Sequence, residues 1–270
     1  MKINSKTIIY TYLLLYISLL VGFYFNEDFA GGYKIDYFIY ENVVVEFQRN
    51  LKNSLLFYEK FDIDTSPFFI LLISFIHQIS FDESYARFLI LNFSLLLPYI
   101  FYLCIKTKYE KQNQYLLSLI PVIIFISPYY RSSSIWMGPE NVSIIFFLLS
   151  IYFFLKHEKD RDNLTFIILN AFFLAFTAYI RPIYSIFSIY FFLKFYFNIK
   201  FSKNLIYYVL LNILLSLPAF YYVFIMEINF FWSALVNEVS LSKYVNQLAV
   251  TISLIFFYSM PFLFFQYSNF

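Results

Sequence analysis

A short apolar stretch, SPFFILLISFIHQI, occupies residues 66–79 and decides the topology of the chain. Ser66 suits an N-cap and Pro67 the first position of a helix, so the sequence predicts a helix over 67–79. Its roughly 13 residues are short for a membrane span, which needs about 20, and are typical of an interfacial or re-entrant helix. Whether this helix crosses the membrane sets the side on which every later loop lies.

The chain around this stretch is strongly apolar. Of its 270 residues, 61% are hydrophobic, 25% aromatic and only 13% charged. A soluble domain carries about twice that share of charge. Cys104 is the single cysteine, which excludes a disulfide framework, and a net charge of +2 gives no reason to expect a nucleic-acid partner. We therefore expect an all-α polytopic membrane protein with one transmembrane domain over residues 1–270.

Hydropathy predicts about eight spans, and the first begins after the charged residues Lys2 and Lys6. This first segment has no small-residue cleavage site, so we expect it to be retained as an anchor. The predicted spans lie near residues 7–25, 87–105, 114–130, 141–155, 164–180, 183–197, 204–225 and 247–265.

The positions of Lys and Arg decide between the two possible topologies, because these residues favour cytoplasmic loops when the loops are short. If 67–79 does not cross, the basic clusters within 106–111, 156–161 and 194–203 all join the N-terminus inside. If it crosses, all three clusters move outside. The sequence therefore predicts a non-crossing helix and a cytoplasmic N-terminus, in what we expect to be a bacterial inner membrane.

The outer surface then collects four connections, at 26–86, 130–139, the Arg181-Pro182 turn and 226–246. A complete chain ends inside, but residues 266–270 carry no Lys or Arg to mark an inner end, so C-terminal truncation stays open.

A second helix is predicted in the first outer loop, over 35–52. Ile39, Val43 and Phe47 recur every four residues, with Val44 and Leu51 beside them. We expect this amphipathic helix to lie along the membrane interface with its apolar face down. The loop thus holds two juxtamembrane helices, near 35–52 and 67–79.

Acidic residues near the start of this loop are candidates for general-base chemistry. Glu27 and Asp28 follow the first span and precede the flexible Gly31-Gly32. A carboxylate at this position can deprotonate an acceptor hydroxyl; the alternative is a solvated loop end. Asp36 is a further candidate, although an acid in a first helical turn also has an ordinary dipole-matching role. His77 is expected to pack at the interface.

The second outer loop carries the other candidate acid, Glu140. Pro139 suits the first position of a helix, which places Glu140 in its first turn at the membrane boundary. A carboxylate at that depth needs a partner, water or a metal ion, unless helix-end stabilisation explains it. Arg131 is its candidate partner or a phosphate ligand, or else it snorkels. Arg181 lies at the tip of a predicted hairpin. It either has only this structural place or binds an anionic lipid phosphate.

The sequence contains no His/Cys metal spacing, P-loop, G-x-S-x-G or Rossmann motif. No residue is therefore assigned as a metal ligand, and the inner loops are too short for a nucleotide site. Any donor substrate must be a lipid or must reach the outer face.

The order of these parts resembles the GT-C glycosyltransferases, which include protein O-mannosyltransferases, aminoarabinose transferases and oligosaccharyltransferase catalytic subunits. Glu27-Asp28 stands where those families keep the first acid, and Glu140 where they keep the second. Thr65-Ser66-Pro67-Phe68-Phe69 resembles their His-Pro-Pro-Leu-Tyr entry to the second juxtamembrane helix, without its His. The stretch 80–103, with Arg87 near its start, resembles the next span. The resemblance covers residues 1–190, and Pro-Glu-Asn replaces an Asp-x-Asp in the second loop.

This resemblance implies a cell-envelope transferase with a polyprenyl-phosphate-sugar donor and a lipid, glycan or protein acceptor. Asp28 or Glu27 would be the base, Arg131 and Arg181 would hold the departing phosphate, and Glu140 would place the donor or a divalent cation. Further substrate contacts are expected from Asp36, Trp136 and Asn141. Two other classes stay open, a lipid or glycan transporter or flippase and an inactive membrane scaffold. The nearly apolar span centres speak against a transport pathway.

Overall fold

The computed structural model describes residues 5–61, 63, 65–80, 82–161 and 163–225, which form helices and turns and no strand. All described helices belong to one compact unit, Met1–Ile228. Within them, four helices are long and apolar enough to cross a membrane, and a bent pair adds a fifth if it counts as one span. The chain is thus an all-α membrane protein. The predicted span 247–265 and loop 226–246 lie outside the described residues.

The membrane-length helices alternate with shorter ones along the chain. The long elements are α1 (Ser5–Tyr24), α5 with α6 (Glu83–Ser94 and Leu96–Lys108), α10 (Pro139–Lys159) and α13 (Lys203–Phe220). The shorter α11 (Leu164–Ile180) and α12 (Phe187–Ile199) flank η2 (Pro182–Ile186), and η3 (Tyr221–Ile225) ends the described part. The spans predicted near 164–180 and 183–197 fall on α11 and on η2 with α12, which are shorter than the membrane-length helices, so the number of eight spans stays a prediction.

The bent pair corrects the prediction for residues 114–139. Helices α7 (Gln114–Leu119) and α8 (Val122–Ile126) are followed by α9 (Pro128–Ile135), which turns by 68°. We predicted a loop from residue 130, but a new helix starts at Pro128 because the hydroxyl of Ser127 accepts the backbone N–H of Tyr130 at 3.4 Å. Arg131 therefore lies in a helix.

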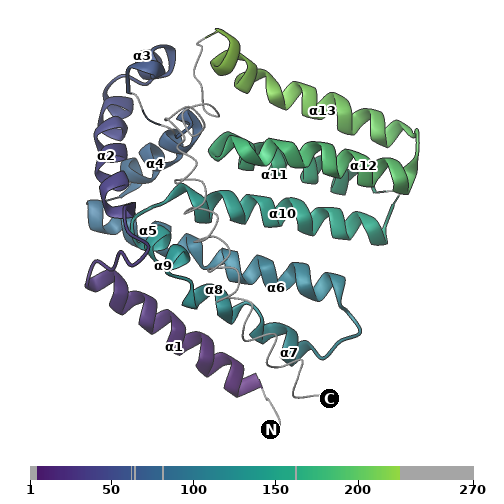
Figure 1. Cartoon of the computed structure of the whole chain (residues 1–270), viewed down its shortest axis with the longest axis horizontal. Coiled ribbons are helices and arrows are strands. Elements are labelled where there is room, and N and C mark those ends of the chain that lie inside the picture. Colours follow the sequence, from purple (N-terminus) through teal and green to yellow (C-terminus); the bar gives the residue numbers. More distant parts are fainter. Residues whose placement is uncertain (1–4, 62, 64, 81, 162, 226–270) are drawn as a thin grey trace, which may run out of the picture. The chain divides into compact units, whose positions relative to one another are not determined.

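The first outer loop folds into α2 (Tyr33–Arg49), α3 (Leu51–Leu56), η1 (Tyr58–Phe61) and α4 (Pro67–Ile79). The bounds of α4 are those predicted, with Ser66 in an extended N-cap conformation. The Ser66 hydroxyl does not cap the helix, because it donates to the carbonyl of Tyr179 in α11. Helices α2, α3 and α4 lie at one end of the long helices, where α4 is next to α5 and α2 is next to α9 (Figure 1).

Helix α2 packs on α4 with part of the apolar face that was predicted to lie on the membrane interface. Val43, Val44 and Phe47 of that face are buried in the protein, together with Tyr37 and Tyr40, whose ring lies 5.9 Å from that of Phe69. The other members of the predicted face, Ile39 and Leu51, are 45% and 48% exposed. Leu51 belongs to α3, because Asn50 leaves helical geometry at φ −151° and its side chain caps α3.

Charged residues pair at both ends of the bundle. At the end that holds the turns 109–113 and 160–163, Lys108 lies 3.8 Å from Glu158, and Lys159 pairs with Glu110. At the opposite end Arg131 pairs with Glu27, and Arg181 with Glu140. The loops that the sequence assigned to one side of the membrane thus meet at one end of the structure.

Candidate functional site

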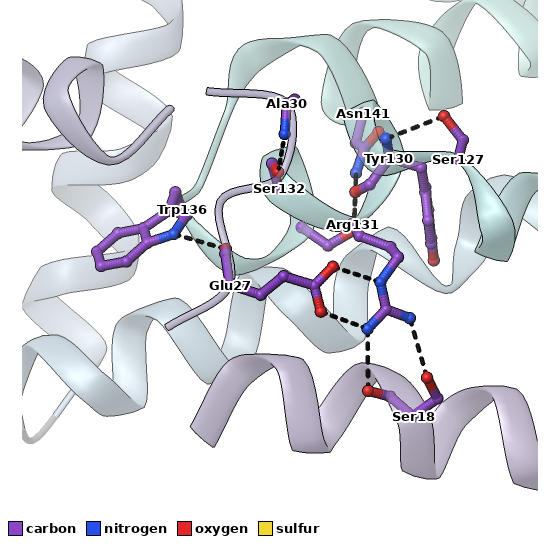
Figure 2. Close-up of polar contacts among 10 residues, drawn as sticks. Ser18, Glu27, Ala30, Ser127, Tyr130, Arg131, Ser132, Trp136 and Asn141 are labelled. Carbon is purple, nitrogen blue, oxygen red and sulfur yellow. Dashed lines mark hydrogen bonds and ion pairs between the residues drawn. The ribbon is translucent and has the colours of Figure 1, made fainter. Parts of the chain in front are cut away.

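An ion pair between Glu27 and Arg131 joins the end of α1 to α9. Arg131 Nε and Nη2 each lie 2.5 Å from a different oxygen of Glu27, and both side chains are buried, with 7% and 14% exposed. The same guanidinium donates to the carbonyl and hydroxyl of Ser18 at 3.1 and 3.2 Å (Figure 2). Such a two-pronged contact fixes geometry as well as charge. Both oxygens of Glu27 are therefore committed to Arg131.

Gly22 of α1 makes room for this pair. A Cβ atom at this position would lie 2.3 Å from Glu27 Oε2 and 2.8 Å from Arg131 Nη2. Any side chain larger than hydrogen would displace the pair. The glycine is therefore required by close approach and not by a turn, since it lies within the helix.

Trp136 and Arg87 pack beside the backbone around Glu27. The indole N–H of Trp136 donates to the Glu27 carbonyl at 2.9 Å, and only 3% of the residue is exposed. The Arg87 guanidinium lies 3.7 Å from the Trp136 ring centroid and donates to Ile135 O at 3.0 Å and to Asn26 Oδ1 at 2.9 Å. Trp136 thus packs within the protein in this structure, and its contact with a substrate stays a prediction. Sequence reasoning missed Arg87 as a connector; its only signal was an Arg in the first half of an apolar helix.

The serine run of α9 holds the two outer loops together. Ser132 accepts the backbone N–H of Ala30 at 3.1 Å, while Asn141 donates to Tyr130 O at 2.9 Å and to Ser134 at 2.8 Å (Figure 2). Asn141, predicted as a substrate contact, is 3% exposed and joins α9 to α10. These bonds join the two loops into one connected unit, so the loops are not independent of each other.

Asp28 lies beside the first turn of α2. Its Oδ2 accepts the backbone N–H of Lys34 at 3.2 Å, which supplies the cap that Gly32 cannot give. Gly32 itself adopts a positive φ of 96°, which a glycine tolerates. Asp28 Oδ1 is buried and has no hydrogen-bond partner among the described residues. One oxygen of this carboxylate is thus available for chemistry.

Glu140 pairs with Arg181, and not with Arg131 as one alternative had it. The pair is partly open, with 33% of the Glu140 and 27% of the Arg181 side chain exposed. The hydroxyl of Tyr33 in the first turn of α2 lies close to Glu140, and burial together with this negative charge raises the pKa of Tyr33. The Tyr33 ring lies over Gly138, where a Cβ atom would come within 2.6 Å of Cε1.

The remaining candidates lie apart from this cluster. Asp36 is on the exposed side of α2. Partial burial in α4 lowers the pKa of His77, which favours its neutral form. No group of three His, Cys, Asp or Glu side chains is arranged to hold a metal ion within the described part of the chain. A divalent cation therefore stays an expectation drawn from the resemblance alone.

Comparisons of this chain with protein-family models, with curated proteins and with solved structures find no match. Its function is therefore inferred from its own residues.

Proposed function

We propose that the chain is an integral-membrane glycosyltransferase of the GT-C kind, moving a sugar from a polyprenyl phosphate to an acceptor hydroxyl. The observation that carries this proposal is the difference between the partners of Glu27 and those of Asp28. Both oxygens of Glu27 face Arg131, whereas Asp28 has one oxygen fixed by α2 and the other free. A general base needs such a fixed carboxylate with an open lone pair.

In the proposed reaction Asp28 Oδ1 accepts the proton of the acceptor hydroxyl. The acceptor oxygen forms a bond to the anomeric carbon, while the bond from that carbon to the phosphate oxygen breaks. The electron pair leaves with the polyprenyl phosphate, whose charge a guanidinium can stabilise. Arg181 is the better placed of the two predicted arginines, because its ion pair is partly open while Arg131 is buried against Glu27 and Ser18.

The placement of the site supports the membrane topology proposed with it. Glu27, Asp28, Arg131, Glu140 and Arg181 all gather at the end opposite to the basic turns 109–113 and 160–163. With basic loops inside, these residues face the outer side, where a polyprenyl-linked sugar is within reach. We propose eight spans, a cytoplasmic N-terminus and an inner-membrane location on this basis.

A membrane scaffold is the second candidate function. The observation that favours it is that Glu27, Trp136 and Asn141 are all used to tie the loops together. A scaffold would need Asp28 only as a cap for α2, so the two functions differ in what the free oxygen of Asp28 does.

The test compares Asp28→Asn with wild type in membranes supplied with polyprenyl-phosphate hexoses. Asn is as good a cap as Asp, so the cap on α2 is kept while the base is lost. We expect kcat to fall by about 10²- to 10⁴-fold. Asp160→Asn, an exposed carboxylate after α10, is the control and should keep full activity. Equal transfer by Asp28→Asn and wild type would refute Asp28 as the base.

A further inference from the structure

The carboxylate of Glu140 has one oxygen in an ion pair and one oxygen without a partner. Its Oε1 pairs with Arg181, while its Oε2 is buried and has no hydrogen-bond partner in the described structure. A buried carboxylate oxygen without a donor costs free energy, which a ligand that brings a hydroxyl or N–H group would recover.

The groups around Glu140 favour a neutral polyhydroxyl ligand over a metal ion. Arg181 places a positive charge directly on the carboxylate, which opposes the binding of a divalent cation. Tyr33 adds a neutral hydroxyl from α2, close to the same carboxylate. Tyr184, whose ring lies 5.0 Å from that of Phe147, stands near the same pair. A carboxylate, a guanidinium and tyrosine rings together match the hydroxyls and the apolar faces of a sugar.

We infer that Tyr33, Glu140 and Arg181 form a subsite for the hydroxyls of the donor sugar, in which Glu140 Oε2 accepts a hydrogen bond from one hydroxyl. Glu140 is then a specificity residue and not a base or a metal ligand. Tyr33 acts as a positioning residue, since its hydroxyl lies beside the carboxylate on the side of α2 and its ring occupies the space over Gly138. The inference rests on the proposed function and gives its second acid a defined role.

The test assays wild type and Glu140→Gln, each with the best polyprenyl-phosphate hexose and with its monodeoxy forms. For wild type, removing the hydroxyl that Glu140 binds should raise KM by about 10- to 100-fold, the range for a hydrogen bond to a charged group. In Glu140→Gln the same deoxy donor should lose clearly less, because the two changes remove one contact. Equal losses in both proteins for every deoxy position would overturn the inference.

Tyr33→Phe tests the positioning role. It keeps the ring over Gly138 and removes the hydroxyl, so we expect a higher donor KM with nearly unchanged kcat. Tyr24→Phe, at a residue 79% exposed at the end of α1, is the matched control and should leave both constants as in wild type. A fall in kcat alone for Tyr33→Phe, at wild-type KM, would contradict the assignment.

A failure of the proposed function is distinguishable from a failure of this inference. If wild type transfers no sugar from any donor, the function is wrong, and the subsite is then tested by thermal unfolding with methyl hexosides. Stabilisation of wild type by one hexoside, reduced in Glu140→Gln, supports a sugar subsite. If no methyl hexoside stabilises wild type, the sugar subsite is ruled out.

Discussion

Gly22 lies under the Glu27–Arg131 pair, so a single methyl group added there acts directly on the site. Alanine is the better helix former by about 0.5–1 kcal/mol, and in an open helix Gly22→Ala would stabilise the protein. Here the added Cβ meets the far ends of the Glu27 and Arg131 side chains, which must shift, and such overpacking costs about 1–3 kcal/mol. We expect a net loss of about 1–2 kcal/mol in the free energy of unfolding, measured by denaturation in detergent.

The control for this prediction removes the carboxylate. Gly22→Ala added to a Glu27→Ala protein should cost clearly less than Gly22→Ala added to wild type, because the closest clash is gone. If the substitution costs the same in both backgrounds, the close approach at Gly22 does not depend on the pair.

At the residue scale the sequence identified which charged side chains share one end of the structure but not how they pair. Glu27, Arg131, Glu140 and Arg181 were all candidates, and the structure brings all four to one end. Arg131 was one candidate partner of Glu140, with a bound phosphate and snorkelling as the alternatives. It selects Glu27 instead, since α9 bends toward α1, and a bend produced by Ser127 and Pro128 was not foreseen within an apolar run.

At the scale of elements, α4 could be predicted and the orientation of α2 could not. The start of α4 depends on two local signals, Ser66 and Pro67, which need no tertiary information. Helix α2 carries apolar residues on two faces, since Ile35, Phe38 and Ile39 are exposed while Val43, Val44 and Phe47 are buried. Periodicity alone did not separate these faces, because the neighbour that covers one of them, α4, comes later in the chain.

The packing of α2 on α4 gives a matched pair of substitutions. Ile73 of α4 is 1% exposed and Ile39 of α2 is 45% exposed. Ile73→Ala should destabilise by about 2–5 kcal/mol, whereas Ile39→Ala should stay within about 0.5 kcal/mol. Chemical denaturation of both variants in the same detergent measures the difference. Equal losses would mean that the face centred on Ile39 is also packed against the protein.

For the whole molecule, the sidedness of the loops is the property on which the proposed function depends most. The turn 109–113 and the turn 160–163 share one end through the pairs Lys108–Glu158 and Lys159–Glu110, and the candidate site is at the other end. The distribution of Lys and Arg assigns the first end to the cytoplasm. If the basic end is cytoplasmic, the site end lies on the outer side, because α10 connects the two ends.

Cysteine labelling in intact spheroplasts tests this sidedness directly. In a Cys104→Ser background, which removes the one native cysteine of the chain, Gln112→Cys represents the basic end and Ser185→Cys the site end; both positions are exposed. A membrane-impermeant maleimide should label Ser185→Cys in intact spheroplasts and Gln112→Cys only after lysis. The reverse pattern would place Asp28 and Glu140 in the cytoplasm. A donor presented at the outer face would then be out of reach, and the scaffold would become the better account of the paired acids and arginines.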